Sequence, residues 1–132
     1  MEKVYKILLI DDDEVDRSFV RRYLSKSNFS FVISECSSGS ASLKECEENK
    51  FDCIFLDYNL LDMDGIDVLE KILHIDPYVS VVFLTGMSDE LLAVQAIKNG
   101  AADYLAKDGL SSVVLAQCIQ NLEMGKPRKR QN

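Results

Sequence analysis

Short apolar segments alternate along this chain with longer segments in which apolar residues recur every three or four positions. Continuous apolar runs are typical of strands buried on both faces, and the longer spacing is typical of helices with one buried side. The apolar runs predict five strands, at Val4–Ile10, Phe29–Cys36, Phe51–Leu56, Val79–Leu84 and Ala102–Ala106. The helical spacing predicts five helices, at Glu14–Ser25, from Ser38 to near Asn49, at Ile66–Ile75, from a cap at Ser88 or Asp89 to Asn99, and from a cap at Ser111 or Ser112 onward.

Strands that alternate with helices predict an α/β fold, in which a parallel sheet with right-handed crossovers carries helices on both faces. In the first predicted helix, Val15, Phe19 and Tyr23, and also Val20 and Leu24, recur at four-residue spacing and should form one apolar side. Ligands of such sheets bind outside the carboxyl ends of the strands, where the strand order reverses. The residues at those ends are therefore the candidates for function.

Three consecutive aspartates, Asp11, Asp12 and Asp13, follow the first predicted strand. Like charges held this close repel one another and raise one another's pKa. A hard divalent cation such as Mg²⁺ would relieve the repulsion, because such cations prefer carboxylate oxygens. The alternative is a solvated acidic turn that begins a helix, since acidic residues are favoured at helix N-termini. The triplet alone does not decide between the two interpretations.

Three other predicted strands also end in residues with useful chemistry. The third is followed by Asp57, the fourth by Thr85 and the fifth by Lys107, whereas the second ends in Cys36 and Ser37. Taken singly, Asp57 could cap a turn, Thr85 could be an ordinary strand residue and Lys107 a solvated charge. Together, at one edge of a sheet, they supply a nucleophile, a hydrogen-bond donor and a cation, which are the groups needed to hold a phosphoryl group.

Composition limits the other classes of function. The 132 residues suggest one domain, and no apolar stretch approaches the roughly 20 residues that a membrane span requires. The chain opens without the pattern of a signal peptide. The four cysteines form no Cys-x-x-Cys pair, and the single histidine, His74, offers them no partner for zinc, so we expect small, buried or half-buried thiols in a reducing compartment. A cytoplasmic location follows as the expectation.

Charge is distributed unevenly along the chain. The net charge is −7, from 15 basic and 22 acidic residues, but four of the basic residues lie in the last seven positions. The remaining body has 11 basic against 22 acidic residues and should be repelled by nucleic acid. Gly125 and Pro127 are expected to break the last helix. We therefore predict one domain over residues 1–124 and a basic tail at 125–132 that begins a linker.

At this point the chain resembles a response-regulator receiver domain of the chemotaxis-regulator kind over its whole length apart from the tail. The motifs that carry the resemblance are Ile7–Asp13, Phe55–Asp57 with Met63–Gly65, Val82–Gly86 and Gly100–Lys107. The resemblance implies a flavodoxin-like strand order of 2-1-3-4-5. It also implies a signalling phosphoacceptor of a two-component system or phosphorelay. Such a domain catalyses only its own phosphorylation and dephosphorylation.

The resemblance also implies roles for individual residues. Asp57 would accept a phosphoryl group from a phosphohistidine of a sensor histidine kinase or a histidine phosphotransfer protein. Asp11 and Asp12 would form the acidic pocket for Mg²⁺, with Asp12 and Asp57 as direct ligands and Asn59 contributing its backbone carbonyl. Asp13 is more simply the start of a helix.

Further implied roles concern the response to phosphorylation. Thr85 and Lys107 would bind the phosphoryl oxygens, and Tyr104 would turn inward when Thr85 is drawn to the phosphate. Their movement would change the surface of the fourth helix, fifth strand and fifth helix. A downstream output domain or protein would recognise this surface, and a homodimer could form through it. Switching of this kind shifts two populations of one fold.

Two positions depart from the family pattern. Asp108 stands where receivers carry a proline after the lysine, so the Lys107–Asp108 bond should be trans, or a strained cis bond held by its surroundings. Leu61 also replaces a proline, in a loop where Leu60 or Leu61 either packs beneath the loop or contacts a partner. These departures leave open a pseudo-receiver that binds partners without being phosphorylated.

Two other classes of protein share parts of this pattern. Asp11–Val15 fits the nucleophile motif of haloacid-dehalogenase-type phosphohydrolases, with Asp11 as the nucleophile. That interpretation leaves Asp57 unexplained, and the chain has no room for a cap. A flavodoxin-like cofactor binder would need a hydroxyl- and glycine-rich loop in place of the aspartates, which would repel a phosphate unless a metal intervened.

Overall fold

A parallel sheet forms the centre of the computed structural model, which describes residues 3–86 and 89–125. In this part of the chain the sheet has five strands in the order β2-β1-β3-β4-β5, as predicted. The strands are β1 (Val4–Ile10), β2 (Ser30–Cys36), β3 (Cys53–Asp57), β4 (Ser80–Thr85) and β5 (Asp103–Ala106). The helices are α1 (Glu14–Ser25), α2 (Gly39–Glu48), α3 (Gly65–Ile75), α4 (Glu90–Lys98) and α5 (Ser112–Gly125). The predicted α/β fold class is confirmed.

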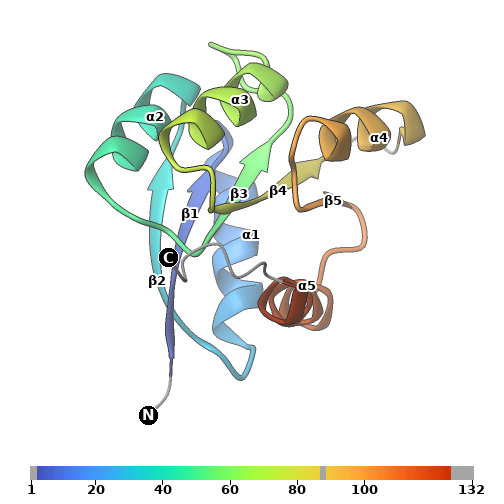
Figure 1. Cartoon of the computed structure of the whole chain (residues 1–132). Helices are drawn as coiled ribbons and strands as arrows, with labels where there is room; N and C mark the ends of the chain where they lie inside the picture. Colours follow the sequence, from blue (N-terminus) through green and yellow to red (C-terminus); the bar gives the residue numbers. More distant parts are fainter. Residues whose placement is uncertain (1–2, 87–88, 126–132) are drawn as a thin grey trace.

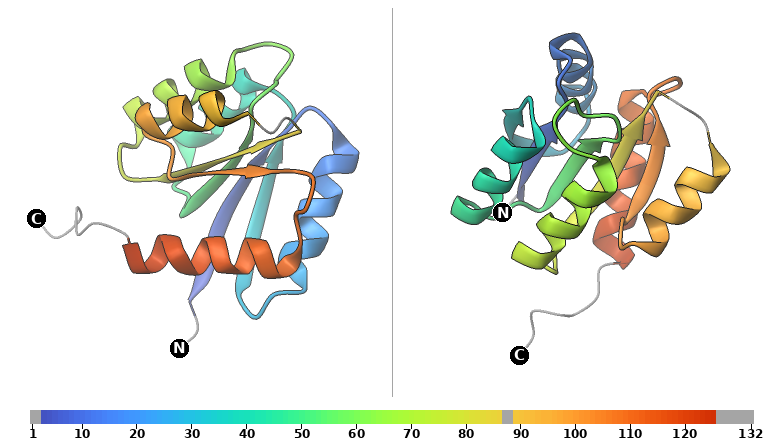
Figure 2. Two further views of the ribbon diagram at one scale, coloured as in Figure 1. Left: turned by 90° about the vertical axis from the view of Figure 1, so that its right-hand side faces the viewer. Right: turned by 90° about the horizontal axis from the view of Figure 1, so that it is seen from above.

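Helices cover both faces of the sheet. Figure 1 and the left view of Figure 2 show α2, α3 and α4 on one face and α1 and α5 on the other. The central strands therefore send alternate side chains into two cores. On β1, Leu8 and Ile10 belong to the core beneath α2, α3 and α4, whereas Ile7 and Leu9 belong to the core beneath α1 and α5. All four side chains are buried, which explains why the strand is continuously apolar.

The sequence specifies the helix starts through side-chain caps. The side-chain oxygens of Asp13, Ser38, Asp64 and Asp89 accept hydrogen bonds from backbone N–H groups in the first turns of α1 to α4. Each cap satisfies a donor that the helix itself leaves unpaired. The prediction that Asp13 starts a helix is confirmed, and Asp89 caps α4. Ser88, the other candidate cap, lies outside the described residues.

The single apolar side predicted for α1 was only partly right. Val20 and Leu24 are buried against the sheet, but Val15 is 59% and Phe19 is 42% exposed, and Tyr23 is half-buried. The sheet contacts a narrower stripe of α1 than the four-residue spacing suggested. Of these surplus apolar residues, Phe19 and Tyr23 line the groove described below, together with residues that follow β5.

Smaller differences occur at the ends of elements and around the cysteines. α5 ends at Gly125, which is the last described residue, and the basic residues of the predicted tail lie outside the described residues. All four cysteines are free and buried, as expected. Cys36 ends the edge strand β2. No helix in residues 3–86 and 89–125 combines the length and apolar character needed to cross a membrane.

The strand order places one reversal in the sheet. From β1 the chain moves by way of α1 to β2 on one side, and from β2 it returns by way of α2 to β3 on the other. The crossovers that follow β1 and β3 thus lie on opposite faces of the sheet (Figure 2). A crevice at the carboxyl ends of two such strands is the usual ligand site of open parallel sheets.

Candidate functional site

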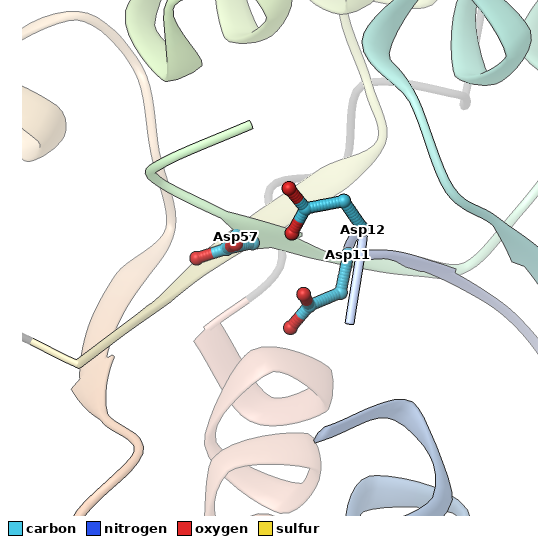
Figure 3. A group of neighbouring side chains, drawn as sticks. All are labelled: Asp11, Asp12 and Asp57. Carbon is cyan, nitrogen blue, oxygen red and sulfur yellow. The ribbon is translucent and has the colours of Figure 1, made fainter. Parts of the chain in front are cut away.

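Three carboxylates meet where β1 and β3 end. Ile10 pairs with Leu56 in the sheet, so the next residues, Asp11 and Asp57, come out side by side. Each of Asp11, Asp12 and Asp57 offers one carboxylate oxygen, and these oxygens lie within 4.8 Å of one another (Figure 3). Asp11 is 6% and Asp57 is 5% exposed, and Asp12 is half-buried. The arrangement matches what a hard divalent cation requires of oxygen ligands.

Asp11 is fixed on both sides. Its backbone N–H donates to the carbonyl of Cys36 at 3.1 Å, and its Oδ1 accepts from the N–H of Asp13 at 2.9 Å. Burial raises the pKa of Asp11 to about 6, because the effect of burial, with repulsion from Asp57, exceeds the lowering by Lys107 and the Asp13 N–H. The protein thus holds a carboxylate in surroundings that disfavour its charge, and a bound cation would reverse that preference.

Lys107 crosses the crevice from the end of β5. Its backbone N–H donates to the carbonyl of Thr85 at 2.7 Å, which fixes it beside β4. Its ammonium lies 2.8 Å from Asp11, 2.7 Å from Asp16 and 3.4 Å from Asp57. Burial alone would lower the pKa of Lys107, but the hydrogen bonds to Asp11 and Asp16 raise it above its usual value. Lys107 is therefore a permanently charged group beside the carboxylates.

Of the remaining predicted residues, Thr85 and Asn59 lie at the same edge and Tyr104 lies within β5. Thr85 is fully buried at the end of β4, and Tyr104, opposite Phe83 in the sheet, is half-buried against the core beneath α4. Asn59 is exposed, and its N–H donates to Asp57 Oδ1 at 3.4 Å. The structure thus brings six of the seven predicted site residues to the carboxyl edge and places Tyr104 two residues before the end of β5, while the roles assigned to them stay predictions.

The loop after β3 is held at several points. Leu60 packs against the core, and the carboxylate of Asp62 accepts from the N–H groups of Gly39 and Ser40 at 2.9 and 3.0 Å. These hydrogen bonds lower the pKa of Asp62. Leu61 lies between the two anchors and is 91% exposed. Of the two apolar loop residues, Leu60 is therefore the one that packs beneath the loop.

Asp108 does not impose a cis bond. Every peptide bond among the described residues is trans, so Lys107–Asp108 takes the first of the two expected forms. The Asp108 side chain is exposed.

Two residues of the site were missed from the sequence. Asp16 contacts the ammonium of Lys107 at 2.7 Å, and Arg17 donates to the backbone carbonyl of Asp11 and pairs with Glu35 at 2.8 Å. The available signal was their place in the first turn after the cap at Asp13, which keeps them near the end of β1. The residues they would reach depend on the rotation of α1, which the pattern of that helix does not define.

Comparison with known proteins adds a family to this geometry. Residues 7–119 match the family model described as the response regulator receiver domain. The chemotaxis protein CheY of Listeria monocytogenes is 32% identical over 102 residues, which span 77% of this chain and 85% of that protein. The transcriptional regulatory protein SrrA of Staphylococcus aureus is 35% identical over 102 residues, which span 77% of this chain but 41% of that protein.

Solved structures resemble the fold closely. The receiver domain of the putative regulator NarL from Mycobacterium tuberculosis has a TM-score of 0.84 at 26% identity, covering 95% of this chain and 99% of that one. A response regulator from Burkholderia pseudomallei, solved with a phosphorylated aspartic acid, a calcium ion and citrate, has a TM-score of 0.76 at 26% identity, covering 96% and 75%.

Proposed function

Since this chain belongs to the family of response regulator receiver domains, we propose that its Asp57 accepts a phosphoryl group from a phosphohistidine of a sensor kinase or phosphotransfer protein. The observation that carries the proposal is the meeting of Asp57 with Asp11, Asp12 and the Lys107 ammonium at one edge of the sheet. The related structure from Burkholderia pseudomallei, which has a phosphorylated aspartic acid, supports it.

The transfer itself needs few groups. A carboxylate oxygen of Asp57 attacks phosphorus, a new P–O bond forms, the P–N bond breaks, and the donor imidazole leaves with the electron pair. The product is an acyl phosphate on Asp57. Because the transferred group is negative, the Lys107 ammonium would bind one of its oxygens and Thr85 would donate to another. The domain acts on itself in this way and has no other substrate.

Mg²⁺ is the proposed cofactor. Asp11, Asp12 and Asp57 would hold it through carboxylate oxygens and Asn59 through its backbone carbonyl, a set of oxygen ligands suited to a hard cation. When bound, the ion neutralises charge that would otherwise repel the incoming phosphoryl group. The raised pKa of Asp11 supports the proposal, since the pocket disfavours its own carboxylate in the absence of a cation.

The same site distinguishes between the two candidate nucleophiles. Both oxygens of Asp11 are engaged, Oδ1 by the N–H of Asp13 and Oδ2 by the ammonium of Lys107 at 2.8 Å. Asp57 has a longer contact of 3.4 Å with that ammonium. A carboxylate whose oxygens already accept short hydrogen bonds is the poorer nucleophile, so the geometry favours Asp57 over Asp11 and a receiver over a phosphohydrolase.

The output surface is proposed to be α4, β5 and α5. Phosphorylation would draw Thr85 and Lys107 toward Asp57, and Tyr104 would follow inward, which would shift the population of two arrangements of this surface. In support, α4 exposes Leu91, Val94 and other apolar side chains that a second copy or an output protein could cover. Relatives named for chemotaxis and for transcription show that the domain occurs with different outputs.

The proposed location is the cytoplasm. The four free thiols support it, because reducing compartments keep cysteines unpaired.

The proposal is tested with phosphoramidate, a small donor whose P–N bond resembles that of phosphohistidine. The 132-residue protein is incubated with the donor and either Mg²⁺ or EDTA, and phosphorylation is followed by intact mass. We expect labelling that needs Mg²⁺ and is lost in Asp57→Asn. Asp52→Asn is the matched control. Asp52 forms an ion pair with Lys3, and both residues precede their strands, at the opposite edge of the sheet from Asp57. This variant should be labelled normally. Labelling of Asp57→Asn at the wild-type rate would contradict the proposal.

A further inference from the structure

Asp16 makes the shortest ion pair of Lys107, and the proposed phosphoryl transfer gives it no role. We propose that Asp16 is a positioning residue that holds Lys107 in the resting state and must release it before Lys107 can bind a phosphoryl group on Asp57. The inference rests on the proposed function, because release has a purpose only if Asp57 becomes phosphorylated. It predicts that Asp16 opposes activation.

The hydrogen bonds around the Lys107 ammonium are unevenly distributed. A lysine ammonium has three donors. Lys107 uses two of them in hydrogen bonds to Asp11 Oδ2 at 2.8 Å and Asp16 Oδ2 at 2.7 Å. Its contact with Asp57 Oδ1 is 3.4 Å, which is an ion pair but a weak hydrogen bond at best. In this state the ammonium is held nearer to α1 than to the phosphoacceptor.

Of the two carboxylates that accept hydrogen bonds from Lys107, Asp16 is the one that loses its bond more easily. The side chain of Asp11 is 9% exposed and that of Asp16 is 34% exposed. A carboxylate that loses its partner must be solvated, and this costs more in a buried place than in a half-exposed one. When a phosphoryl group competes for Lys107, the bond to Asp16 is therefore the one that breaks, and Asp11 keeps its own.

The Asp16 side chain has room to move while its backbone is held. A groove of about 300 Å³ beside it is lined by α1 and by the residues that follow β5, including Lys107, Asp108 and Leu110. The backbone of α1 is held by the ion pairs of Arg17 and Arg21 with Glu35 on β2, at 2.8 and 2.6 Å. Release can thus be a rotation of one side chain into the groove.

The negative charge of Asp16 also opposes the binding of a phosphoryl group by Lys107. The Asp16 carboxylate adds a negative charge next to the lysine that should attract the phosphoryl group. A neutral side chain of the same shape at this position would offer Lys107 a poorer acceptor and remove that charge. An exposed or half-exposed charge-assisted contact contributes modestly, so the expected change in affinity is roughly five-fold.

Beryllofluoride, which mimics a phosphoryl group on a carboxylate, is the probe for this test. The full chain is titrated with it in saturating Mg²⁺, and the bound fraction is read from fluorine NMR. Asp16→Asn should bind roughly five-fold more tightly than the wild type. Asp16→Glu keeps the charge and should bind like the wild type. Glu14→Gln removes an exposed charge from the same helix turn without touching the ion pairs of Lys107, and should change affinity less than two-fold.

A second measurement separates positioning from a merely structural role. The nitrogen resonance of the Lys107 ammonium reports its hydrogen bonds directly. In the absence of beryllofluoride it should shift in Asp16→Asn and stay in place in Asp16→Glu and Glu14→Gln. Beryllofluoride itself should shift it in the wild type, as the ammonium moves from Asp16 toward the ligand.

The outcomes distinguish the two levels of the argument. If wild-type protein binds no beryllofluoride with Mg²⁺, the phosphoacceptor proposal fails and the inference falls with it. If the wild type binds and Asp16→Asn binds equally or more weakly, the inference alone is overturned. Equal tightening by Asp16→Asn and Glu14→Gln would also overturn it, since the effect would then be one of general charge.

Discussion

Replacing Asp11 by asparagine should make the metal-free protein more stable near neutral pH, although it removes a short ion pair. Asp11 is 6% exposed, and burial raises its pKa to about 6. A carboxyl group whose pKa is raised on folding contributes its full stability below the unfolded pKa and loses it as pH rises through the folded pKa. The loss for Asp11 therefore falls between about pH 4 and pH 6. Asparagine cannot ionise, so the variant does not lose this stability as pH rises.

The size of the effect follows from the same values. A rise from 3.8 to about 6, at about 1.4 kcal/mol per pH unit, corresponds to about 3 kcal/mol as an upper limit. The amide of asparagine offers Lys107 a poorer acceptor than the carboxylate at 2.8 Å, which offsets part of the gain. We expect a net stabilisation of about 1–2 kcal/mol, which would raise the melting temperature by several degrees.

Urea unfolding in EDTA measures the prediction directly. Wild type and Asp11→Asn are compared near pH 7 and near pH 4, where the Asp11 carboxyl is protonated and the difference should vanish. Added Mg²⁺ should narrow the difference, because a ligand at about ten times its Kd stabilises the wild type by about 1.4 kcal/mol and the variant should bind the ion more weakly. If Asp11→Asn were the less stable protein in EDTA near pH 7, the reasoning about the buried carboxylate would be refuted.

Three further changes test other parts of the structure. A Cβ at Gly65 would lie 2.6 Å from the carbonyl oxygen of Tyr58, so Gly65→Ala should lower the free energy of unfolding in urea by about 1–3 kcal/mol. Gly86→Ala is the control: its Cβ meets nothing within 4 Å and should cost less than about 1 kcal/mol. Burial raises the pKa of three thiols, to about 11 for Cys36 and about 12 for Cys46 and Cys118. A thiol reagent near pH 8 should therefore label them only after unfolding. Rapid labelling of the native protein would contradict the burial of these cysteines. Asp62→Ala removes two hydrogen bonds to the start of α2 and should cost about 1 kcal/mol near pH 7. Because the pKa of Asp62 is lowered, this cost should fall as pH falls through the folded pKa, and a cost that does not change in acid would contradict the role of the carboxylate.

The sequence predicted the fold because each level of its pattern agrees with the others. In β3 every position before Asp57 is apolar since both faces of the sheet are covered, and the aspartate that ends this run marks the edge of the sheet. Asp57 could be placed beside Asp11 from the resemblance and the strand order, without knowledge of any side-chain contact. The strand ends were therefore predictable because parallel strands bring their carboxyl ends together.

The contacts of Asp16 and the exposure of Phe19 were not predictable in the same way. Both depend on the rotation of α1 about its axis, and that helix has more apolar residues than the sheet covers. A periodic pattern defines the rotation only when one side is apolar and the rest is polar. The raised pKa of Asp11 likewise requires the depth of burial and the position of Lys107, which a sequence pattern does not supply.

The central claim is that Asp57 is the residue that carries the phosphoryl group. Its most direct test is to locate the modification in wild-type protein treated with phosphoramidate and Mg²⁺. Reduction with borohydride cleaves an acyl phosphate and marks the aspartate that carried it, and peptide sequencing by mass spectrometry then identifies the position. The account predicts a mark on Asp57 and none on Asp11 or Asp12. A mark on Asp11 would contradict it and would favour the phosphohydrolase interpretation.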